Sequence, residues 1–109
     1  MLSRSFASEN NITIIGEGMN RVETEAAKRP GSVILNNMPE FTGEKYQITS
    51  KMMENNRSWW LDQMRTGRPV YNIGLDIYRQ EPSIFYQMEQ NMMNNYLKLH
   101  PNAFQIINP

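Results

Sequence analysis

The chain has 109 residues, enough for one small domain, and its 11 basic and 11 acidic side chains give a formal net charge of zero. Proteins that bind nucleic acid without regard to sequence usually carry a basic excess, so a broad basic surface is not expected here. The absence of cysteine excludes disulfides, cysteine-based zinc sites and a thiol nucleophile.

Strands and helices are predicted to alternate along the chain. Residues 11–15 are mostly β-branched and show little polar alternation, which is typical of a strand buried on both faces. A helix is predicted over residues 19–28 and a second short strand over residues 32–35. A longer helix is then predicted over residues 49–65, because Met and Trp recur on one of its faces.

A third strand is predicted over residues 70–73, and a last helix over residues 83–97 with Ser83 at its N-terminus. The apolar tail, residues 101–109, is expected to dock as an edge strand. This order predicts an α/β fold: a small three-layer βαβαβα domain with a mostly parallel sheet of about three strands. Residues 1–10 are expected to be a flexible lead-in or linker, and residues 11–109 a single domain.

Polar side chains gather where the predicted strands end. In open parallel sheets, ligands bind beyond the carboxyl ends of the strands, so these side chains are candidates for one site. The candidates are Gly16, Glu17, Gly18 and Arg21 after the first strand, Asn36 and Asn37 after the second, and Gly74, Asp76, Arg79, Ser83, Tyr86 and Glu89 after the third.

Each candidate also has a purely structural interpretation. The turn around Glu17 either brings backbone N–H groups to an anion or is a tight turn whose carboxylate stabilises the helix dipole. Asp76 and Arg79 could form a local ion pair that shapes their loop. Tyr86 could be half-buried core, and Glu89 one solvated residue of an amphipathic helix. It is their conjunction at one sheet edge that favours a site.

Two neighbouring tryptophans and one histidine need separate interpretations. Adjacent residues of a helix point in different directions, so one of Trp59 and Trp60 is expected to pack against the sheet. The other is expected to cover the site, stack on a base or contact a partner protein.

His100 lies near the C-terminus without a partner motif, which indicates a surface residue. No apolar run approaches 18 residues, so no membrane span is predicted.

Three segments resemble the C-terminal toxin domains of bacterial polymorphic toxins, which end rearrangement-hotspot (RHS) repeat proteins and contact-dependent growth inhibition effectors. The segments are IIGEGMNRV at residues 14–22, GRPVYNIGLDIYR at residues 67–79 and PSIFYQME at residues 82–89, with a Trp-bearing helix between the first two. Carried over by position, the resemblance points to Glu17, Arg21, Asp76, Arg79, Ser83, Tyr86 and Glu89. Asn72 departs from it, because an acidic residue is expected at that position.

The resemblance implies a domain that is secreted as part of a larger effector, acts in the cytoplasm of a target cell and is neutralised by a cognate immunity protein. The leading hypothesis is a nuclease, with RNA favoured as substrate. Glu17, Asp76 or Glu89 would then act as acid or base. Arg21 and Arg79 would stabilise the phosphate, and Tyr86 would position the substrate or protonate it. Gly16, Gly18, Asn36 and Ser83 are expected to bind substrate. The zero net charge counts against this hypothesis.

Cofactor use is left open by the sequence. The cofactor is unknown: none is required, or a carboxylate pair holds a Mg²⁺ ion together with water and substrate phosphate, as a variant of the nuclease hypothesis.

Two other functions remain open. A toxin that degrades NAD(P) or another nucleotide fits a neutral surface and a site beside a glycine turn, with a buried Glu stabilising an oxocarbenium-like centre. A non-enzymatic accessory subunit of a larger assembly fits the Met- and Asn-rich composition and the Trp pair. That third hypothesis predicts an exposed apolar surface and no toxicity.

Overall fold

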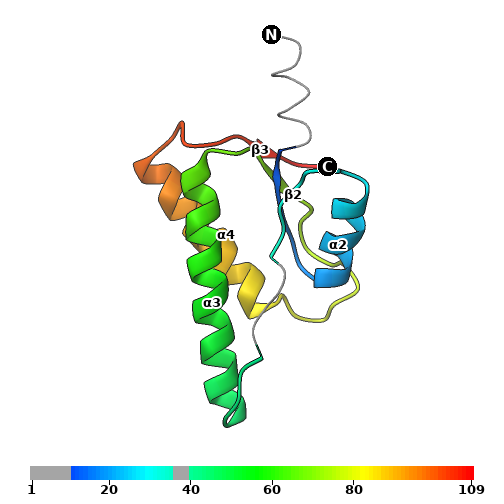
Figure 1. Ribbon diagram of the computed structural model, residues 1–109, viewed down its shortest axis with the longest axis vertical. Coiled ribbons are helices and arrows are strands. Elements are labelled where there is room, and N and C mark those ends of the chain that lie inside the picture. The colour runs from blue at the N-terminus through cyan, green and yellow to red at the C-terminus, as the bar shows by residue number, and fades with distance from the viewer. Residues whose placement is uncertain (1–10, 36–39) are drawn as a thin grey trace.

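The computed structural model describes residues 11–35 and 40–109. Within them, three helices flank a three-stranded parallel sheet of order β1-β2-β3 (Figure 1). The elements in chain order are β1 (Thr13–Ile15), α2 (Met19–Ala27), α3 (Lys45–Thr66), β2 (Val70–Asn72), α4 (Ile84–Leu99) and β3 (Ile106–Ile107). The predicted α/β class and the docking of the apolar tail as an edge strand are confirmed.

The helices lie in two layers, with α2 on one side of the sheet and α3 and α4 together on the other (Figure 1). Successive residues of β1 point to opposite layers, as a strand requires. Ile12 and Ile14 therefore pack with Val22 on the α2 side. Ile15 packs with Trp60 and Met64 on the α3 and α4 side. The strand is buried on both faces, which explains its lack of polar alternation.

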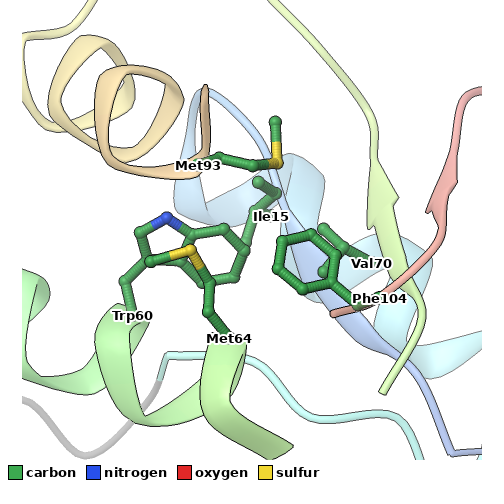
Figure 2. Close-up of a cluster of buried hydrophobic side chains, with 6 residues drawn as sticks. All are labelled: Ile15, Trp60, Met64, Val70, Met93 and Phe104. Atoms are coloured by element: carbon green, nitrogen blue, oxygen red, sulfur yellow. The ribbon is translucent and has the colours of Figure 1, made fainter. Parts of the chain in front are cut away.

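The larger core cluster lies between the sheet and the helices α3 and α4 (Figure 2). Its members are Ile15, Trp60, Met64, Val70, Met93 and Phe104. The Trp60 ring is fully buried, and its Nε1–H donates to the backbone carbonyl of Glu89 at 3.0 Å. Trp60 is thus the tryptophan that packs against the sheet, and it ties α3 to α4 at the position of Glu89.

Two predicted elements differ from the structure by more than two residues at an end. Residues 32–35 do not form a strand; Val33 makes a single parallel bridge to Thr13, through backbone hydrogen bonds with Ile12 and Ile14. Helix α3 begins at Lys45, four residues earlier than predicted, because Glu44 and Gln47 form a reciprocal capping box at its N-terminus. Both corrections leave the layered architecture unchanged.

Helix α4 begins at Ile84, one residue after the predicted start, with Ser83 as its N-cap. The Ser83 hydroxyl accepts a hydrogen bond from the backbone N–H of Phe85 at 3.2 Å, so it caps the helix. The expectation that residues 1–10 are a flexible lead-in falls outside the described residues. His100 follows the last helix and is exposed, as predicted.

Candidate functional site

A cavity of about 210 Å³ lies beyond the carboxyl end of β1, between the turn that follows it and helices α3 and α4. Val33 pairs with one side of β1 and β2 with the other, so the chain changes its direction of travel across the sheet at β1. Open α/β sheets bind ligands at such a switch point. The cavity is lined by Ile14, Ile15, Gly16, Glu17, Gly18, Met19, Val22, Leu35, Met52, Asn56, Trp59, Arg79, Ser83, Phe85, Tyr86 and Glu89.

The Glu17 carboxylate joins three segments of the chain at this edge. It follows β1 and is only 1% exposed. Its Oε1 accepts from the backbone N–H of Asp76 at 2.8 Å, and its Oε2 accepts from the backbone N–H of Ser83 at the start of α4. The hydrogen bond from Ser83 is the largest cause that lowers the pKa of Glu17, and Asp76 N–H and Arg79 add to it against the opposing effect of burial. Glu17 is therefore ionised at neutral pH.

Arg79 is the cation beside Glu17. Its Nε lies 3.8 Å from Glu17 Oε2, and its side chain is 48% exposed at the cavity. Asp76, in contrast, turns its carboxylate to its own loop, where Oδ1 accepts from the backbone N–H of Tyr78 at 3.0 Å. Arg79 thus keeps donors for a ligand, whereas Asp76 contributes its backbone N–H to the site and its carboxylate to the loop.

Arg21 is placed differently from Arg79. Its Nη1 donates to the carbonyl oxygens of Glu17 at 2.8 Å and Gly74 at 3.1 Å, and its Nη2 donates to that of Ile73 at 3.2 Å. These bonds fasten the turn after β1 to the end of β2. Arg21 lines a neighbouring hollow and is not in the wall of the candidate cavity.

The two arginines are expected to respond differently to removal. Arg21→Ala removes the Arg21 donor from the carbonyl groups of Glu17 and Ile73, while the Gly74 carbonyl keeps the backbone N–H of Glu17. We therefore expect it to lower the free energy of unfolding by about 1–3 kcal/mol. Arg79→Ala removes a half-exposed side chain, so we expect the free energy of unfolding to change by at most about 0.5 kcal/mol. Urea unfolding of both variants measures this contrast. An Arg21→Ala protein as stable as the wild type, or an Arg79→Ala protein destabilised as strongly as Arg21→Ala, would contradict it.

Tyr86 and Asn72 form a buried polar contact between α4 and β2. The Tyr86 hydroxyl donates to Asn72 Oδ1 at 3.0 Å, and the backbone N–H of Gly74 donates to the same oxygen at 3.0 Å. Asn72 Nδ2 donates to Gln90 Oε1 at 3.2 Å. Burial raises the pKa of the Tyr86 phenol, so the hydroxyl stays protonated. Asn72, at the position where the resemblance expects an acid, thereby orients the Tyr86 ring at the cavity wall.

Glu89 is the second carboxyl group of the cavity. It lies three residues after Tyr86 on α4, so the two share a helix face. Burial raises its pKa to about 8, which makes the carboxyl group mostly protonated at neutral pH. The cavity therefore holds one ionised carboxylate, Glu17, and one protonated carboxyl group, Glu89. Glu89 is partly buried, between the solvated position of the structural alternative and a fully buried one.

The glycine and serine candidates have local roles in the structure. A Cβ at Gly16 would overlap the Ile73 side chain, so glycine allows the close approach of β1 and β2. Gly18, with φ of 88°, precedes the first turn of α2. Both glycines and Ser83 also line the cavity. Asn36 and Asn37 lie outside the described residues.

Helix α3 contributes cavity residues that the strand-end argument did not predict. Trp59 is half-buried in the cavity wall, which agrees with the expectation that one tryptophan covers the site. Asn56 was not predicted at all. It is 5% exposed, and its Oδ1 has no hydrogen-bond partner among the described residues. The sequence signal was a polar residue between Met52 and Trp60, at four-residue spacing on an otherwise apolar helix face.

An exposed apolar segment borders the site between β2 and α4. Ile77 and Tyr78 are 83% and 90% exposed, and Leu75 and Ile84 are each 51% exposed. Such a surface fits contact with another protein.

In residues 11–35 and 40–109, no helix is long and apolar enough to cross a membrane.

No group of three His, Asp or Glu side chains in the described part of the chain could hold a metal ion. Both oxygens of Glu17 already accept backbone hydrogen bonds, so this carboxylate would have to give up a partner to bind Mg²⁺.

Comparison with known proteins gives no relative of this chain. No family model, no curated protein and no solved structure matches it.

Proposed function

We propose that this chain is the toxin domain of a secreted polymorphic or contact-dependent inhibition effector, and that it cleaves RNA in the cytoplasm of a target cell. The observation that carries the enzymatic part is a protonated Glu89 that shares one cavity with the half-exposed Arg79. A carboxyl group whose burial keeps its proton at neutral pH can act as a general acid, and a cation in the same cavity can stabilise developing negative charge. The resemblance of the three quoted segments carries the toxin part, including a cognate immunity protein.

The proposed reaction is attack of an RNA 2′-hydroxyl on the adjacent phosphorus. A new 2′-O–P bond forms and the P–O5′ bond breaks, which leaves a 2′,3′-cyclic phosphate and a 5′-hydroxyl. Glu89 donates its proton to the departing O5′, and the proton of the 2′-hydroxyl passes to water. Arg79 supplies positive charge at the phosphate in the transition state. The lowered pKa of Glu17 makes it a weak base, so its role is to hold Arg79 and the start of α4.

Cleavage of an N-glycosidic bond in NAD(P) or another nucleotide is the second candidate. The cavity favours this candidate. Its volume is about 210 Å³ and its wall is largely apolar, which suits a small ligand better than a polynucleotide. The zero net charge supports the same alternative. Glu17 would then stabilise positive charge on the sugar, and Glu89 would protonate the departing base.

Expression of the full chain in the cytoplasm of a bacterium tests these proposals. We expect the wild type to arrest growth and the Arg79→Ala variant to allow it, with both proteins present in soluble, folded form. The integrity of total RNA and the amount of NAD are measured in the same cultures. Degraded RNA supports the ribonuclease, and depleted NAD supports the NAD-degrading alternative. A folded wild type that leaves growth, RNA and NAD unchanged would instead favour the accessory subunit, whose expected apolar surface the segment around Ile77 and Tyr78 provides.

A further inference from the structure

The wall of the cavity formed by α3 carries a buried amide with an unused acceptor. Asn56 is 5% exposed and its Oδ1 has no partner in the described residues. It lines the cavity together with Met52 and Trp59, its neighbours on the same helix face. Buried polar atoms in native proteins nearly always have a hydrogen-bond partner, so an exception in a cavity wall indicates a missing ligand or water.

The position of Asn56 makes little sense for stability alone. The neighbouring positions on this face, four residues away on either side, are Met52 and the fully buried Trp60. An apolar side chain of similar size at position 56 would continue this stripe and leave no unsatisfied oxygen. A polar residue at such a place fits a functional requirement, because stability and function often conflict at binding sites.

The amide is held at a fixed place relative to the proposed reacting groups. Trp60, one turn after Asn56, donates its indole N–H to the backbone carbonyl of Glu89 at 3.0 Å. This bond joins α3 to α4 at the residue whose carboxyl group lines the same cavity. A ligand that contacts Asn56 therefore shares one cavity with the Glu89 carboxyl group and the half-exposed Arg79.

We infer that Asn56 recognises a nucleobase, whose edge bonds to the amide and whose ring lies against Trp59. This inference rests on the proposed function, because the base belongs to a nucleotide-containing substrate. An Asn side chain presents an acceptor beside a donor, and base edges present the complementary pair. Aromatic side chains bind bases by stacking. The cavity of about 210 Å³ holds one ring system and leaves sugar and phosphate near Arg79.

Tryptophan fluorescence of the full-length chain measures this binding, because both tryptophans lie at or beside the cavity. The probes are AMP, GMP, CMP, UMP and short single-stranded RNA, which separate free nucleotides from RNA as the source of the base. We expect the wild type to bind at least one mononucleotide or oligonucleotide with a base preference. Asn56→Leu should weaken that binding by about tenfold or more and leave the melting midpoint unchanged or higher. Asn94→Leu, on an exposed position of α4, should change neither quantity.

The outcomes separate this inference from the proposed function. Binding of no nucleotide or oligonucleotide by the wild type, equal binding by Asn56→Leu, or a strongly lowered melting midpoint in Asn56→Leu would each overturn it; the last would show that the amide is structural. If Asn56→Leu weakens base binding but the wild type consumes neither RNA nor NAD, base recognition stands and the proposed function fails. If the wild type cleaves RNA and Asn56→Leu binds and cleaves equally well, the proposed function stands and base recognition by Asn56 fails.

Discussion

Glu89→Gln is expected to slow substrate cleavage by about 10²- to 10⁴-fold at pH 7 while the protein stays folded. Burial raises the pKa of Glu89 to about 8, so the native side chain is mostly a neutral carboxylic acid at that pH. Gln has the same shape and charge as this protonated form. It differs chiefly in having no acidic proton to give to a leaving oxygen. Steady-state cleavage rates and thermal melts of the two purified proteins measure the effect.

The same pKa predicts how activity and stability depend on pH. Activity that needs the proton of Glu89 falls as the pH rises through about 8. Because the pKa is raised in the folded state, the contribution of Glu89 to stability is complete below pH 4.5 and is lost as the pH rises through about 8. The loss amounts to at most about 5 kcal/mol. Glu89→Gln lacks this loss, so we expect its melting midpoint to exceed that of the wild type increasingly from pH 5 to pH 9.

Glu54→Gln provides a matched control for the change of a carboxyl group to an amide. Glu54 is an exposed residue of α3, outside the cavity wall, so this variant should match the wild type in rate and melting midpoint at every pH. A Glu89→Gln protein that cleaves at the wild-type rate, with the same pH profile, would remove Glu89 as the proton donor.

Local patterns in the sequence were enough to predict most of the fold. The β-branched run around Thr13–Ile15 and the apolar stripe with Trp60 and Met64 each identify an element without knowledge of its partners. The segment at residues 32–35 has the same local pattern as a strand but forms one bridge at Val33. Strand pairing depends on neighbours that the local sequence does not contain, so a short apolar segment alone does not establish a strand.

The site was predictable as a place, but the use of its polar atoms was not. Strand ends in a parallel sheet meet at one edge, which brought Glu17, Arg79 and Glu89 into one prediction. The sequence does not reveal that the Arg21 guanidinium donates its hydrogen bonds to backbone carbonyl groups, whereas the Arg79 side chain stays half-exposed. Nor does it give the rotation of α3 about its axis, which decides that Asn56 faces the cavity.

Glu17→Ala is expected to be the most destabilising single change among the site residues. The backbone N–H groups of Asp76 and Ser83 both donate to this buried carboxylate, and Arg79 lies beside it. Removal of the carboxylate leaves two N–H groups without an acceptor, one of them at the positive end of the α4 dipole. We expect the melting midpoint to fall by on the order of 10 °C at pH 7. Glu23→Ala, at an exposed position of α2, is the matched control and should melt as the wild type does.

The acid dependence of stability gives an independent check on Glu17. Its pKa is lowered in the folded state, chiefly by the hydrogen bond from Ser83, so its contribution is present above the usual carboxyl pKa of 4.5 and is lost as the pH falls through the lowered value. The difference in melting midpoint between the wild type and Glu17→Ala should therefore shrink below pH 4.5. A constant difference from pH 7 to pH 3 would show that the ionised carboxylate is not what holds β1, the loop at Asp76 and α4 together. Since Glu17 supports the fold, a loss of activity in its variants does not show that it takes part in the reaction. The Glu89→Gln variant tests the acid–base step directly.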